Sequence, residues 1–61
     1  MTEANISEEL LNIVHHAPLW PGDTISHSTA AECVRRGLAR RNRNGNFVPT
    51  FKGRLRVLLA R

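Results

Sequence analysis

Arginine is the residue type in this chain that offers the most chemistry, and it is unevenly placed. The 61 residues include nine Lys and Arg against five Asp and Glu, for a formal net charge of +4. All five acids lie in residues 1–32 and all nine bases lie in residues 33–61, eight of them arginine. Because guanidinium groups match phosphate geometry, the second half predicts a surface for nucleic acid or another polyanion. The two halves could instead complement each other in the fold, but five acids cannot neutralise nine bases. The remaining alternative to a polyanion surface is a solvated basic face.

Histidine and cysteine, the other reactive residue types, do not form a recognisable site. His15 and His16 are adjacent, so on a helix they point about 100° apart and cannot easily share one metal ion. Cys33 is the single cysteine and lies on an apolar stripe, which predicts a buried core residue rather than a nucleophile. The sequence also lacks a glycine-rich phosphate loop. We therefore expect no metal, no cofactor and no enzymatic activity.

The length of the chain sets limits on its organisation. A chain of 61 residues buries only about 60% of the surface that its unfolded form exposes, so one domain over residues 1–61 is expected, with residues 1–5 as a flexible N-terminus. Its stability should be only about 3–5 kcal/mol. No basic secretory start and no apolar run near 20 residues is present, which predicts a cytoplasmic protein without a membrane partner.

The elements that must position the arginines begin with two helices. The first is expected from a cap at Asn5 to about His16, because Pro18 prevents its continuation. Its apolar stripe consists of Ile6, Leu10, Ile13, Val14 and Ala17. The second is expected over 27–36 and ends at Gly37 in the left-handed conformation. Ser26, Ser28 and Thr29 are all competent caps for its start, and Thr29 with Glu32 matches a capping box.

The loop over residues 18–24 joins these helices and carries two large apolar side chains, Leu19 and Trp20. Pro21-Gly22-Asp23 is a turn signal. A tryptophan buries much apolar surface while its N–H needs a partner, so we expect Trp20 to close one end of the core.

A β-hairpin is expected over residues 38–49, followed by a third helix. Asn44-Gly45 predicts a two-residue hairpin tip, and Pro49 confines the second strand to an edge. Thr50 is the expected cap of the helix. The residues expected to face the core from it are Phe51, Leu55, Leu58 and Leu59. Because the small core needs this stripe, membrane binding by the basic helix is not expected.

The order of these elements and three short motifs resemble the winged helix-turn-helix family. The motifs are Arg36-Gly37-Leu38, the glycine at position 45, and the run from Thr50 to Arg54. In that family the recognition helix ends in Arg-Gly-Leu-Val, the wing turns at a glycine, and the return strand enters a Leu-Thr-x-x-Gly-Arg helix. The resemblance covers about residues 25–60 and implies an α+β domain of the order helix–loop–helix–β-hairpin–helix. The loop leaves no room for the first helix of the helix-turn-helix, so a trimmed winged helix is expected.

The resemblance implies that the second helix faces the major groove and that the hairpin follows the phosphates. It further implies that His27 and Ser28 contact the edges of the bases. The expected phosphate contacts are Arg35, Arg36, Arg40, Arg41 and Arg43, with help from Lys52 and Arg54. The predicted function is a small accessory or regulatory protein that binds nucleic acid, DNA more than RNA, as in bacterial or phage transcription. A homodimer is compatible with it, because one monomer offers only one short half-site.

Fold does not determine function, and truncated winged helices also serve as protein-binding modules. The alternative is a module, such as a phage-type modulator, that docks on an acidic host protein. Leu19, Trp20 and Phe47 would then be exposed anchors, because aromatic side chains dominate interface hot spots. A third interpretation, an RNA- or ribosome-associated domain, uses the same arginines and differs in its preference for RNA.

Overall fold

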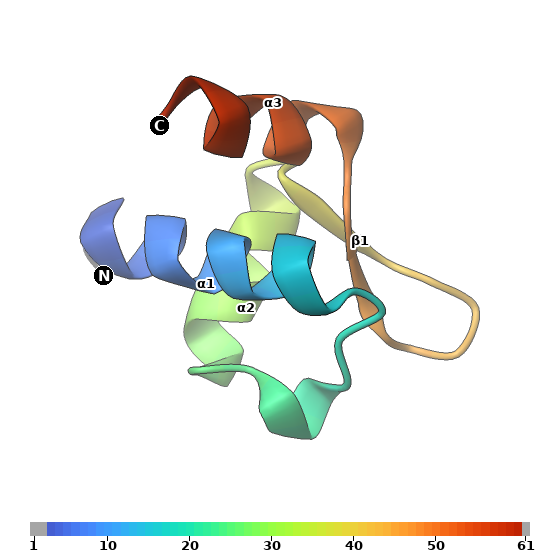
Figure 1. The fold of residues 1–61 in the computed structure, drawn as a ribbon. Coiled ribbons are helices and arrows are strands. Elements are labelled where there is room, and N and C mark those ends of the chain that lie inside the picture. The colour runs from blue at the N-terminus through green and yellow to red at the C-terminus, as the bar shows by residue number, and fades with distance from the viewer. Residues whose placement is uncertain (1–2, 61) are drawn as a thin grey trace.

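A short β-hairpin projects from one side of three packed helices in the computed structural model, which describes residues 3–60 (Figure 1). In chain order the elements are α1 (Glu3–His16), the 3-10 turn η1 (Pro21–Asp23), α2 (His27–Arg35), β1 (Ala39–Arg41), β2 (Phe47–Pro49) and α3 (Phe51–Leu59). This order confirms the predicted α+β class and is compatible with winged-helix topology. Figure 1 shows α1 and α3 lying one above the other, with the hairpin extending beyond them.

Helix α1 ends at His16, as Pro18 predicts, but its start differs from the expectation. Asn5 lies inside the helix and does not cap it, because the helical backbone already includes Glu3. Residues 3–5 are therefore helical, and the rest of the expected flexible N-terminus lies outside the described residues. The inward face of α1 buries Ile6, Leu10 and Ile13 completely or almost completely.

The end of α2 confirms the predicted glycine cap. Gly37 has φ +75°, its N–H donates to the Val34 carbonyl at 3.0 Å, and the Leu38 N–H donates to the Cys33 carbonyl at 2.9 Å. These two bonds form a Schellman motif, which turns Leu38 back into the core. At the start of α2, Ser26 is the N-cap, which is one of the three expected caps, although its side chain makes no capping hydrogen bond. The capping box of Thr29 and Glu32 is wrong, because Thr29 is buried within the helix.

Strands β1 and β2 pair antiparallel, with Ala39 opposite Pro49 and Arg41 opposite Phe47. The loop is one residue longer than predicted: the Asn42 N–H donates to the Asn46 carbonyl at 2.9 Å, which leaves residues 43–45 at the tip. Gly45 alone takes the left-handed conformation there, at φ +81°, as in three-residue hairpin loops. The glycine was therefore placed correctly, whereas the two-residue tip was not.

The loop between α1 and α2 pairs with the hairpin through one isolated antiparallel β-bridge. The N–H of Leu19 donates to the Phe47 carbonyl at 2.9 Å, and the Phe47 N–H donates back to the Leu19 carbonyl at 2.8 Å. This bridge directs Leu19 and Phe47 into the core, where both are nearly fully buried. Trp20 points outward and is 58% exposed, so the prediction that it closes the core is wrong.

Thr50 caps α3 as predicted, because its Oγ1 accepts a hydrogen bond from the Gly53 N–H at 3.0 Å. The predicted orientation of α3 is wrong. Its four large apolar side chains, which were expected in the core, are exposed: Phe51, Leu55, Leu58 and Leu59. The helix packs through its small residues instead, with Gly53 buried and Val57 against the core.

Candidate nucleic-acid interface

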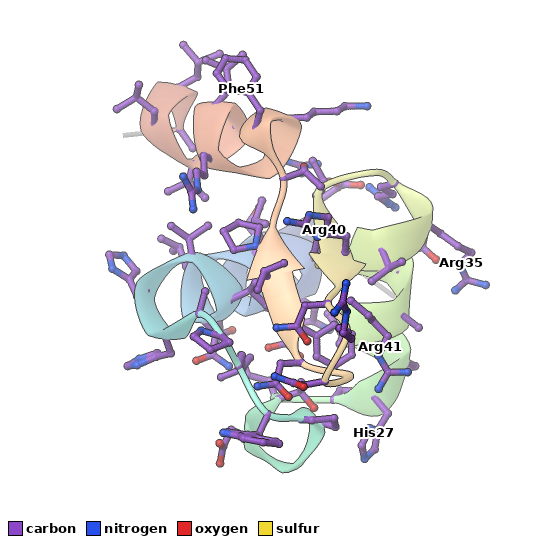
Figure 2. All side chains as sticks on the ribbon, turned by 90° about the vertical axis from the view of Figure 1, so that its right-hand side faces the viewer. His27, Arg35, Arg40, Arg41 and Phe51 are labelled. Carbon is purple, nitrogen blue, oxygen red and sulfur yellow. The ribbon has the colours of Figure 1, made fainter. Side chains whose placement is uncertain are left out.

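Three arginines lie on the projecting hairpin: Arg40 and Arg41 on β1, and Arg43 in its loop. All three are exposed. Neighbouring residues of a strand point to opposite faces, so Arg40 and Arg41 lie on different faces of the hairpin. The guanidinium carbon of Arg41 stacks 4.8 Å from the ring centroid of Phe47, on the face that buries the ring. Both arginines can be followed on the strand in Figure 2.

The hairpin loop has an internal frame that holds Arg43 at its tip. The side-chain Oδ1 of Asn42 accepts hydrogen bonds from the backbone N–H groups of Asn44 and Asn46, each at 2.9 Å. The Gly45 N–H donates to the Asn42 carbonyl at the same distance. Because one asparagine satisfies two loop donors, hydrogen bonds within the loop define its shape.

Two glutamates, Glu3 and Glu32, pair with arginines outside the hairpin. Glu32 contacts Arg35 Nη2 at 2.7 Å and Arg36 Nε at 3.0 Å, and Glu3 bridges Arg36 and Arg56. Within residues 3–60 no carboxylate lies within 4 Å of Arg40, Arg41 or Arg43. Fewer arginines are therefore available to bind a polyanion than the sequence suggests, because Arg35 and Arg36 already have acidic partners.

These ion pairs lower the pKa values of the two carboxyl groups that form them. The hydrogen bond from Arg36, followed by that from Arg56, holds the pKa of the Glu3 carboxyl below its usual range. The hydrogen bond from Arg36 also lowers the pKa of Glu32. Since Glu3 lies on α1, Arg36 follows α2 and Arg56 lies on α3, this cluster joins all three helices.

Acid is expected to loosen this cluster. A carboxyl whose pKa is lower in the folded state stabilises the fold above its unfolded-chain pKa of about 4.3, and this stabilisation is lost as the pH falls through the folded-state value. Thermal unfolding followed by circular dichroism at pH 7, 4 and 3 should show a midpoint that falls with acid. The fall should be shallower in Glu3→Gln/Glu32→Gln than in the matched exposed variant Glu8→Gln. Equal slopes in both variants would contradict this role for the cluster.

The remaining predicted contact residues lie at other places on the surface. His27 and Ser28 are exposed at the start of α2, where Ser28 Oγ is 2.9 Å from Ser26 Oγ. Lys52 donates to the Arg36 carbonyl at 3.4 Å, and Arg54 is exposed on α3. Figure 2 shows His27 and Arg35 toward opposite ends of α2, with the hairpin to their left.

The structure separates the three anchors of the alternative function. Only Trp20 is exposed, so the expectation that Leu19 and Phe47 are exposed anchors is wrong. Their mutual backbone bridge explains why they are buried, and the sequence carries no sign of this bridge.

Cys33 is buried, and this burial raises the pKa of its thiol.

Comparison with known proteins identifies no relative of this chain. The chain matches no protein-family model, no curated protein and no solved structure. Within residues 3–60 no group of three or more His, Cys, Asp or Glu could hold a metal ion. No helix in the same range is long and apolar enough to cross a bilayer.

Proposed function

We propose that this chain binds nucleic acid through its hairpin, as a small accessory or regulatory protein. The observation that carries the proposal is that Arg40, Arg41 and Arg43 lie, exposed, on the projecting hairpin and have no acidic partner among the described residues. Arginine forks hold phosphate oxygens with two hydrogen bonds, and an unpaired arginine needs no internal ion pair to be broken first.

The placement of these arginines suits a groove with phosphates along both edges. With Arg40 on one face of the hairpin and Arg41 on the other, each can reach a different strand of a duplex while Arg43 enters between them. Most such contacts go to phosphate and carry no sequence information. Base-edge contacts remain assigned to His27 and Ser28 at the start of α2.

Replacement of hairpin arginines should weaken duplex binding and its salt dependence together. The variant Arg40→Ala/Arg43→Ala removes two phosphate contacts but keeps Arg41 over Phe47. At 0.1 M salt it should lose about 50-fold in affinity, and the slope of log K against log salt should become shallower by about 1.8. Fluorescence anisotropy with a random 20-base-pair DNA duplex at several salt concentrations measures both quantities.

The matched control for this experiment is Arg35→Ala, which removes the same side chain from an existing ion pair. It should change the affinity less than twofold. A salt-independent affinity, or equal losses in the two variants, would remove the hairpin as the binding element. Competition with an RNA duplex of the same sequence tests the preference for DNA.

The exposure of Trp20 favours one second candidate, the protein-interaction module. A tryptophan that is 58% exposed is available as an anchor for an acidic partner. In the duplex experiment Trp20→Ala should bind like the wild type. If the hairpin variants bind DNA as the wild type does, this second candidate takes precedence.

A further inference from the structure

The outer face of α3 is a large apolar surface without a partner among the described residues. It consists of Phe51, Leu55, Leu58 and Leu59, whose exposed fractions are 83%, 42%, 62% and 75%. At 100° per residue these four positions fall within one arc of about 100°. Isolated exposed leucines are ordinary on protein surfaces, but a contiguous apolar arc of this kind marks a contact surface.

This arc lies opposite the side of α3 that contacts the protein. Gly53 is buried against Leu38, and Val57 packs on the core. Figure 1 shows α3 at the edge of the molecule, and Figure 2 shows Phe51 directed away from the other elements. The fold therefore supports α3 from one side and leaves its apolar arc facing outward.

Cationic side chains border the arc on both sides. Lys52 lies next to Leu59 around the helix, and Arg54 lies next to Leu58. Both are exposed, and within residues 3–60 no carboxylate lies within 4 Å of either charge. Helix α3 itself contains no acid. Its exposed surface thus combines an apolar centre with two positively charged edges.

We propose that α3 binds an anionic lipid surface, with its outer face among the acyl chains and with Lys52 and Arg54 at the headgroups. Amphipathic helices with this division of residues lie in the plane of the interface, and their long basic side chains extend to the phosphates. The expectation that this basic helix does not bind a membrane depended on burial of the same four side chains, and the structure exposes them.

A second copy of the chain fits this face less well. Two outer faces packed together would surround one contact with Lys52 and Arg54 from both copies and no acid from α3 to pair with them. A nine-residue helix is also only about 14 Å long, too short for a standard interface of about 800 Å² per partner. A lipid surface instead supplies the negative charge that the borders lack.

Sedimentation with lipid vesicles tests the proposal on the full chain. The wild type should bind vesicles of equal phosphatidylcholine and phosphatidylglycerol, and should bind pure phosphatidylcholine vesicles at least tenfold more weakly. Phe51→Ser/Leu58→Ser should lose at least tenfold in binding to the anionic vesicles. Trp20→Ser, which removes another exposed large apolar side chain outside α3, should bind as the wild type does.

A second variant tests the charged borders without changing the apolar arc. Lys52→Gln/Arg54→Gln should weaken anionic binding by about fivefold for each charge removed. The proposal is overturned if the wild type binds neither vesicle. It is also overturned if analytical ultracentrifugation shows a dimer that Phe51→Ser/Leu58→Ser dissociates.

This proposal is independent of the hairpin function, and the variants separate the two. Arg40→Ala/Arg43→Ala should change vesicle binding less than twofold, whereas Phe51→Ser/Leu58→Ser should leave duplex binding within twofold of the wild type. Loss of both activities in either variant, with the fold intact by circular dichroism, would contradict the assignment of separate surfaces.

Discussion

Gly53→Ala is expected to unfold the domain. A Cβ atom at this position would overlap the carbonyl oxygen of Leu38 and lie 2.9 Å from the carbonyl carbon. The obstacle is backbone, so no rotamer change can relieve it. Any displacement of Leu38 also disturbs its carbonyl, which accepts the Thr50 N–H at 3.1 Å beside the start of α3. Overpacking usually costs about 1–3 kcal/mol and occasionally more. Because the obstacle here is backbone, a cost above about 3 kcal/mol is expected, which is comparable to the total stability of about 3–5 kcal/mol.

Gly22→Ala is the matched control, because no atom lies within 4 Å of a Cβ built there. Urea unfolding followed by circular dichroism should place its free energy of unfolding within about 0.5 kcal/mol of the wild type. Gly53→Ala should show no cooperative transition. A cooperative Gly53→Ala variant with a stability close to that of Gly22→Ala would mean that α3 does not approach the Leu38 carbonyl as closely as described.

The elements that the sequence predicts well are those that one local interaction decides. Pro18 cannot continue α1, Gly37 alone can take the left-handed turn after α2, and Thr50 caps α3 with its own side chain. Each signal acts within four residues, so it is present in the sequence. The length of the hairpin loop depends on Asn42, which lies outside the Asn-Gly pair that predicted it.

The orientation of α3 was not predictable from periodicity. Spacing shows that Phe51, Leu55 and Leu58 share a face, but it does not show what that face contacts. The space is filled instead by Phe47 of β2, by Leu38 just before β1 and by Leu19 in the loop after α1. Because these side chains occupy the interior, α3 is left to pack through Gly53, which the sequence marks only as a weak helix former.

The sequence predicts which residues could form the candidate site, but it does not predict which arginines form ion pairs with glutamates. The bonds from Glu32 to Arg35 and Arg36 span three and four residues, a spacing that a helix brings together. Arg36 also contacts Glu3, which lies 33 positions away in the sequence. Only the packing of α1 on α2 brings these two residues together. Sequence alone therefore identifies the basic half, whereas tertiary structure decides which arginines remain free.

Glu9→Ala is expected to cost most of the stability of the fold. The Glu9 side chain is fully buried, and its carboxylate accepts the N–H of Ile25 at 3.0 Å and the N–H of Ser26 at 3.2 Å. It also accepts a hydrogen bond from Asn12 Nδ2 at 3.1 Å. Through these bonds α1 holds the chain at the start of α2. Removing the acceptor leaves its donors without a partner at about 1–3 kcal/mol each, so a loss of about 3 kcal/mol or more is expected.

The neighbouring Glu8→Ala variant is the control, because Glu8 is an exposed acid on the same helix. It should change the free energy of unfolding by no more than about 0.5 kcal/mol. Urea unfolding should therefore separate two adjacent glutamates by several kcal/mol. In Glu9→Ala, amide hydrogen exchange should accelerate first at Ile25 and Ser26, because their N–H groups lose their acceptor. If Glu9→Ala and Glu8→Ala unfold alike, the buried carboxylate does not hold the start of α2, and the loop from η1 to α2 must be fixed by the Leu19–Phe47 bridge instead.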